Sequence, residues 1–163
     1  PEQIICDHTR SRVITFEESH EREQGRVGCL VSRDPSSWAA NERFPLVDKS
    51  LGALSLSPDG SWLIGVGGPS LSVRDARDLS RTPQKIRSGK LHFTAVAFHP
   101  SGRYLAATSN DATVKLYDTA SWQVAKTYTW DVGRMRSVAF SPDGTLAAAG
   151  SDTGKVVVWD VDV

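Results

Sequence analysis

The residues that could do chemistry are few and scattered along the chain. Its four histidines, His8, His20, His92 and His99, lie far apart, and none has a second histidine at the HxxxH spacing that holds zinc. The sequence HERE, residues 20–23, could be drawn as a metal or acid–base group, but a run of mixed charges is more typical of a solvated loop. We therefore expect no metal, no cofactor and no catalytic residue.

Other catalytic patterns are equally weak. The chain has no GxSxG, P-loop or GxGxxG sequence, and GVGGPS, residues 65–70, leads into a strand and not into the helix that phosphate binding uses. Asp59 and Asp143 each precede a glycine, which is the chemistry of a turn. Cys6 and Cys29 lie in apolar stretches and are expected to be reduced, buried thiols. The prediction is a protein without enzymatic activity.

Charge and composition exclude several classes of partner. The chain has 19 basic and 19 acidic residues, so no global charge attracts nucleic acid or a membrane surface. No run of about 18 apolar residues is present, and PEQIICDHTRSR at the beginning lacks the features of a secretory signal. We expect a cytoplasmic protein that binds neither nucleic acid nor a membrane.

One unit recurs along the chain. Its turn tetrapeptides, SPDG, HPSG and SPDG, begin at Ser57, His99 and Ser141, 42 residues apart each time. The aspartates that close VRD, LYD and VWD are separated by 43 and 42 residues. IICDHTRSRVITF and CLVSRD form a fourth, diverged copy at the beginning, which carries the insertion ESHEREQGR at residues 18–26. The insertion is expected to be a charged functional loop.

Each unit has the pattern of four short antiparallel strands. TAVAF and TVKLY alternate apolar and other residues, and PDG or PSG supplies the tight turn between strands. Both faces of a unit carry apolar residues, so neighbouring units must stack. The sequence predicts an all-β chain of about four blades, approximately 1–50, 51–91, 92–134 and 135–163.

These turns, the VWD sequence and the 42-residue period resemble the WD-repeat β-propeller family over essentially the whole chain. The family braces each blade with a histidine, an aspartate, a serine or threonine and the tryptophan of WD. No blade here has the full set: Tyr117 replaces the tryptophan in the third, and Thr153 stands at the aspartate position in the fourth. We therefore expect blades held mainly by apolar packing.

The resemblance also bears on how the propeller closes. In the family, an outer strand from the beginning of the chain usually completes a last blade that stops after its third strand. Here the first residues already form a first strand, so KVVVWDVDV is predicted to end on an open edge. Either the chain is the carboxyl-terminal part of a larger propeller, or copies associate through that edge into a ring.

For function, the resemblance implies a non-catalytic scaffold that binds proteins or peptides through one loop face. The alternative is the propeller portion of an enzyme, or a regulatory domain of a larger, for example kinase-like, protein. Tryptophan, arginine and methionine are enriched at interaction hot spots, although Trp130 could instead pack between blades. The candidate partner-binding residues are His20, Arg22, Lys90, His92, Phe93, Asn110, Trp130, Arg134, Met135 and Arg136.

Overall fold

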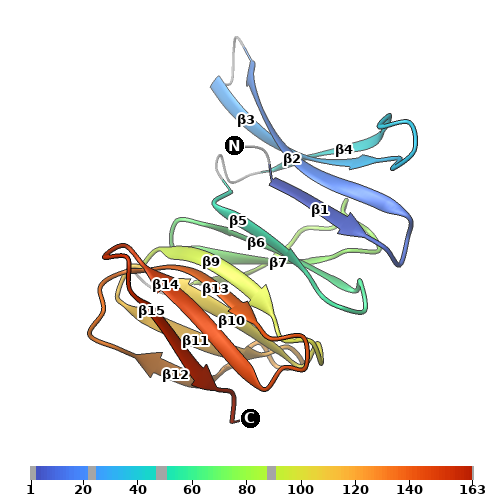
Figure 1. Ribbon diagram of the computed structural model, residues 1–163. Helices are drawn as coiled ribbons and strands as arrows, with labels where there is room; N and C mark the ends of the chain where they lie inside the picture. The colour runs from blue at the N-terminus through green and yellow to red at the C-terminus, as the bar shows by residue number, and fades with distance from the viewer. Residues whose placement is uncertain (1–2, 22–24, 47–50, 88–90, 163) are drawn as a thin grey trace.

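The computed structural model describes residues 3–21, 25–46, 51–87 and 91–162. In this part of the chain there are fifteen β-strands and no helix, which confirms the all-β prediction. The strands form four antiparallel sheets, each of them ordered as its strands follow one another in the chain. The sheets stack in sequence, with the first and the fourth at opposite ends of the stack (Figure 1).

The strand boundaries follow the predicted repeat. Sheet 1 contains β1 (Gln3–Asp7), β2 (Arg12–Glu21), β3 (Gly25–Arg33) and β4 (Ala40–Leu46). Sheet 2 contains β5 (Ala53–Leu56), β6 (Trp62–Gly67), β7 (Ser70–Asp75) and β8 (Gln84–Arg87). Sheet 3 contains β9 (Phe93–Phe98), β10 (Tyr104–Ser109), β11 (Thr113–Asp118) and β12 (Val124–Thr129). Sheet 4 has three described strands, β13 (Met135–Phe140), β14 (Leu146–Ser151) and β15 (Val156–Asp160).

The turn between the first two strands of each repeat is set by local chemistry. Gly60, Gly102 and Gly144 have φ values of 68°, 74° and 77°, in the left-handed region that favours glycine. The Asp59 carboxylate accepts hydrogen bonds from Ser57 Oγ at 2.6 Å and from the Ser61 N–H at 3.0 Å. These bonds, that from Ser57 first, lower the pKa of Asp59 to about 2. The aspartate is a turn former, as its sequence position indicates.

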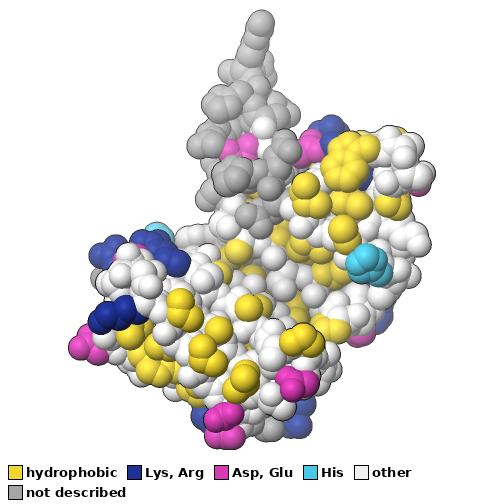
Figure 2. Space-filling model, in the orientation of Figure 1, with side chains coloured by type: hydrophobic (Ala, Val, Ile, Leu, Met, Phe, Trp, Pro, Cys, Tyr) yellow, Lys and Arg dark blue, Asp and Glu magenta, His cyan; other side chains and the backbone are white. Residues whose placement is uncertain are grey.

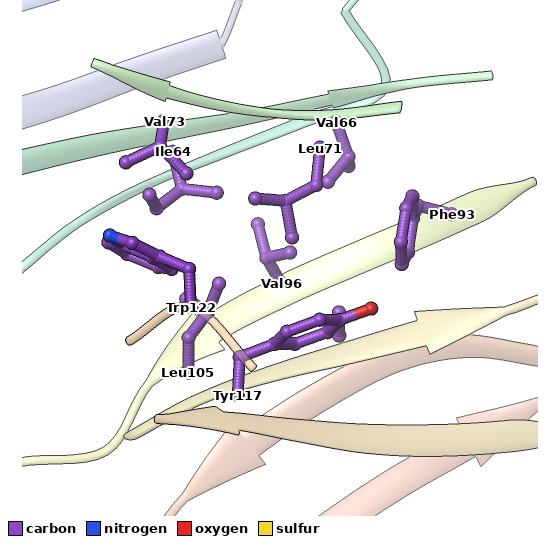
Figure 3. Packing of buried hydrophobic residues seen from close by; sticks show 10 residues of the cluster. Ile64, Val66, Leu71, Val73, Phe93, Val96, Leu105, Tyr117 and Trp122 are labelled. Carbon is purple, nitrogen blue, oxygen red and sulfur yellow. The ribbon is translucent and has the colours of Figure 1, made fainter. Parts of the chain in front are cut away.

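Apolar packing between sheets forms the core. Figure 3 shows the cluster between sheets 2 and 3, in which the labelled side chains of sheet 2 point toward those of sheet 3. The Trp62 and Trp122 rings meet edge to face at 5.8 Å across this interface. A second cluster, including Met135 and Leu116, joins sheets 3 and 4, and a third, including Ile14 and Leu63, joins sheets 1 and 2. Stacking therefore buries the apolar faces that a single sheet would expose.

Sheet 1 departs from the expectations in two ways. The insertion is not a loop over its described residues, because β2 and β3 continue as a hairpin with Glu18 opposite Gly28 and Glu21 opposite Gly25. Residues 22–24 of the insertion lie outside the described residues. Cys6 is exposed and Cys29 is half-buried, so the expectation of buried thiols is wrong for Cys6. Cys6 lies on β1, an edge strand of this sheet, which pairs only with β2 among the described strands.

Candidate functional site

Antiparallel topology brings two kinds of loop to the same end of the sheets. The connection that leads into a sheet and the hairpin between its second and third strands both lie there. We use the name loop rim for these segments of sheets 3 and 4, residues 91–92, 110–112, 130–134 and 152–155. The opposite end, with the proline-glycine turns, is called the turn rim. The loop rim is the predicted partner-binding face.

The same hydrogen-bonded clasp occurs in both loops of the loop rim. In sheet 3, the His92 N–H donates to Asn110 Oδ1 at 3.0 Å, and the Asn110 N–H donates to the His92 carbonyl at 3.0 Å. In sheet 4, the Arg134 N–H donates to Asp152 Oδ1 at 3.0 Å, and the Asp152 N–H donates to the Arg134 carbonyl at 2.9 Å. Each clasp ties an incoming connection to a hairpin, so the backbone beneath the exposed side chains is fixed.

Hydrogen bonds also join neighbouring sheets close to the loop rim. The Phe93 N–H donates to the Gly68 carbonyl at 2.9 Å, which links sheets 2 and 3. The Thr94 hydroxyl donates to the Met135 carbonyl at 2.8 Å, which links sheets 3 and 4. Because these bonds run between sheets, the two clasps are held in a fixed relation to each other.

The predicted residues on the loop rim and at the adjoining strand ends lie in distinct environments. His92, Arg134 and Arg136 have exposed side chains, and Arg136 pairs with the Asp152 carboxylate at 3.5 Å. Phe93 and Met135 do not reach the surface, since they are only 5% and 0% exposed. Because side chains alternate along a strand, both point into the apolar cores between sheets. The prediction that they contact a partner is therefore wrong.

Trp130 packs against other aromatic rings. It stacks on Tyr128 with ring centroids 5.7 Å apart and 4° between planes, and its centroid lies 4.7 Å from that of Trp159. Tyr128 Oη and Trp159 Nε1 are buried there, and neither has a hydrogen-bond partner among the residues described. This stack shows apolar packing where the family places a polar network.

The side chains of three predicted partner-binding residues are not described by the structure. His20 lies on β2 opposite Arg26 in the hairpin. Arg22 and Lys90 lie outside the described residues.

The turn rim carries a set of contacts that the sequence analysis missed. Arg10 donates from Nη1 to the Gly60 carbonyl at 2.6 Å, and Arg12 donates to the Ala76 carbonyl, so sheet 1 is clasped to sheet 2. Between sheets 3 and 4, His99 Nε2 lies 3.0 Å from the Gly144 carbonyl. His99 Nδ1 accepts the Ser101 N–H at 3.1 Å, which places the ring hydrogen on Nε2 as the donor. The repeat pattern carried no signal for these contacts, because each of them joins two different units of the chain.

Asp7 holds the first of these clasps together. Its side chain is fully buried and contacts Arg12 Nε at 2.9 Å and Arg10 Nη1 at 3.4 Å. Burial alone would raise the pKa of Asp7, but the hydrogen bonds from Thr9, Arg12 and Arg10, with the Arg12 charge, lower it. Asp7 is therefore an ionised structural residue.

Two observations describe the acidic and metal-binding side chains of the described residues. Within the described residues, no three histidine, cysteine, aspartate or glutamate side chains gather as metal ligands. The Asp34 and Asp59 carboxylates each have a pKa of about 2, Asp34 chiefly through its bonds from Ser36 and Ser37, so at neutral pH they are not proton donors. No described segment forms a helix of the length and apolarity needed to cross a membrane.

Comparison with known proteins supports the repeat assignment. The family model for "WD domain, G-beta repeat" matches residues 83–118 and 123–160. The chain is 26% identical over 155 aligned positions to the "Target of rapamycin complex subunit wat1" of Schizosaccharomyces pombe, covering 69% of this chain and 49% of that protein. It is 29% identical over 114 positions to the human "Serine-threonine kinase receptor-associated protein", covering 70% of this chain and 32% of that protein. An uncharacterized WD repeat-containing protein of Synechocystis is 31% identical over 100 positions, covering 60% and 28%. The chain thus spans about half or less of the length of these relatives.

Proposed function

The chain belongs to the WD-repeat family of β-propeller proteins, and from that premise we propose that it is a non-catalytic scaffold that binds other proteins through its loop rim. The observation that carries the proposal is the repeated clasp, which fixes the backbone under the exposed His92 and Arg134 side chains. Two relatives have names that describe association with other proteins, as a complex subunit and as a receptor-associated protein.

A fixed backbone favours binding without any chemistry. Ordering a loop at an interface lowers affinity, and the clasps have already ordered the loops before a partner arrives. Arginine is enriched at interaction hot spots, and the loop rim presents Arg134, with Arg136 two residues further on at the start of β13. The Arg136–Asp152 ion pair further restricts the orientation of one of them. The surface therefore suits an extended protein contact with an acidic or hydrogen-bonding partner.

Affinity purification from an extract tests this proposal. We expect the double variant Arg134→Ala with Arg136→Ala to lose partners that the unaltered chain retains. Arg103→Ala is the matched control, because Arg103 is 70% exposed but lies beside the turn rim, paired with Asp118. Identical recovered proteins from both variants and the unaltered chain, with unchanged circular dichroism, would exclude the loop rim as the binding face.

A further inference from the structure

A groove separates sheets 2 and 3 at their outer perimeter. Its volume is about 400 Å³, and it lies between β8 on one side and β11 with the start of β12 on the other. None of the residues of the clasps lines it. The side chains that matter for its chemistry are Gln84, Lys85 and Arg87 from sheet 2, with Lys115, Tyr117 and Trp122 from sheet 3.

The groove is positively charged although the chain is neutral. Three basic side chains line it and no aspartate or glutamate does, in a chain with 19 residues of each sign. Lys85 also takes part in another interaction, so Arg87 and Lys115 are the two cations expected to meet a ligand. The charge of Asp111 reaches Lys115 and offsets part of it, but this one carboxylate stands beside three basic side chains. A local excess of positive charge therefore remains on this surface.

The floor of the groove is rigid. Tyr117 and Trp122 are 3% and 7% exposed and pack into the core of Figure 3, where Trp122 lies near Ile64 and Val73. Trp122 has a left-handed backbone, held by its N–H bond to the Asp118 carbonyl at 2.7 Å. Burial, and then the charge of Asp111, raise the pKa of Tyr117, so its hydroxyl stays protonated and can donate a hydrogen bond.

Two further features indicate an extended ligand. The strand β8 is the outermost of sheet 2 and pairs only with β7 among the described strands, so it has a free edge. A free edge offers backbone N–H and carbonyl groups to an added strand. Val124, at the start of β12, lines the groove and is 48% exposed, an apolar contact beside the charges.

We propose that this groove binds an extended acidic segment of a partner protein. Carboxylates of the segment pair with Arg87 and Lys115, its backbone lies along β8, and an apolar side chain contacts Val124. This site is separate from the loop rim and does not depend on the function proposed there.

Fluorescence anisotropy tests the proposal with a fluorescein-labelled peptide of alternating glutamate and leucine, and with a second peptide in which glutamine replaces each glutamate. We expect the acidic peptide to bind and the glutamine peptide to bind at least about tenfold more weakly. Raising the salt from about 50 to about 300 mM should weaken the acidic peptide further, because these charges are partly exposed.

Charge reversal locates the site. Arg87→Glu with Lys115→Glu should weaken acidic-peptide binding at least about tenfold, and Arg87→Glu alone, at an exposed position, gives a test in which folding is not at risk. Lys155→Glu, exposed on the loop rim, is the matched control and should leave binding unchanged, as should the Arg134→Ala and Arg136→Ala variant. The proposal is overturned by equal affinity for both peptides, or by charge reversal in the groove having no effect.

Two competitors separate the sources of negative charge. Inorganic phosphate and phosphatidylserine vesicles are each added at a charge concentration matched to the peptide. Weaker displacement by both supports a protein segment. The proposal would be overturned in favour of an anion or lipid site by a different result. In that case the peptide does not bind, phosphate or the vesicles bind tightly, and Arg87→Glu abolishes that binding.

Discussion

The two end sheets each have one outward face, and the two faces differ. On sheet 1, Arg33 pairs with Glu17 and lies over the Trp38 ring at 5.6 Å, while Arg43 reaches Glu17 at 3.2 Å. On sheet 4, the outward face is apolar: Leu146, Val156 and Val158 are 41%, 66% and 63% exposed. Figure 2 shows hydrophobic side chains over this end of the molecule, where Figure 1 places β14 and β15. It shows others at the end formed by sheet 1, where Ile4 and Trp38 are 57% and 48% exposed, so the difference lies in the paired charges of sheet 1.

The repeat explains the difference. A shift of 42 residues aligns Ala106, Val114 and Leu116 of sheet 3 with Ala148, Val156 and Val158 of sheet 4. The first three are 0%, 0% and 1% exposed because sheet 4 covers them. Sheet 4 thus presents outward the side chains that sheet 3 has on a covered face. The outward face of sheet 1 is the opposite face of the unit, and there Arg33 stands where sheet 3 has the buried Tyr117. The position in the repeat determines whether a residue is apolar, and the neighbouring sheet determines whether its side chain is buried.

The largest expected effect comes from comparing equivalent positions. Leu116→Ala should lower the free energy of unfolding by about 2–5 kcal/mol, because it leaves a cavity in a packed core. Val158→Ala, at the equivalent but exposed position, should lower it by less than about 1 kcal/mol. Urea denaturation measures both. Equal losses of unfolding free energy would show that Val158 is buried like Leu116, and the difference between the two positions would not exist.

The attachment of sheet 1 should be strongly sensitive to Asp7. Asp7→Asn removes the buried negative charge beside Arg10 and Arg12, and we expect a loss of about 3 kcal/mol. Hydrogen exchange should rise in β1–β4 more than in β9–β12. A uniform rise over all four sheets would mean that sheet 1 does not open separately.

Asp7 also predicts how stability depends on pH. Its pKa is lower in the folded chain, so its contribution is present above the unfolded pKa, near 3.8, and is lost as the pH falls through the folded value. Acid denaturation followed at sheet 1 should show this loss, and Asp7→Asn should remove it. An unchanged acid transition in the variant would contradict the pKa direction.

The smallest effect on stability is expected on the outward face of sheet 4. Replacing Val156 and Val158 together by lysine should change the free energy of unfolding by less than about 1 kcal/mol, because both side chains face solvent. The same change should reduce the fluorescence of an apolar dye that binds exposed hydrophobic surface. Trp38→Lys, on the outward face of sheet 1, is the matched control. A larger dye loss from Trp38→Lys would reverse the comparison.

Most of the fold could be predicted from the sequence because the repeat signals are local. Glycines such as Gly60 and Gly144 fix the turns, and alternating strands fix the faces. Contacts between sheets could not be predicted in this way. Phe93 and Met135 are near loops in the sequence, yet both are buried once the neighbouring sheet is in place.

The polar contacts between sheets were also beyond the sequence pattern. Asp7 lies in the diverged first unit. Its partners Arg10 and Arg12 donate hydrogen bonds to carbonyls of sheet 2 that are about fifty or more residues away in the chain. The groove between sheets 2 and 3 has the same origin, since Arg87 and Lys115 meet only when the sheets stack. The sequence of one repeat therefore does not predict a surface that forms only between two stacked sheets.

The most direct test of the proposed scaffold is photocrosslinking from defined positions. A benzophenone amino acid is placed at His92 or Arg134 on the loop rim, and at Arg103 beside the turn rim, and each chain is irradiated in extract. We expect discrete protein adducts from His92 and Arg134 and none of the same mass from Arg103. Adducts of the same proteins from Arg103, with none from His92 or Arg134, would contradict it.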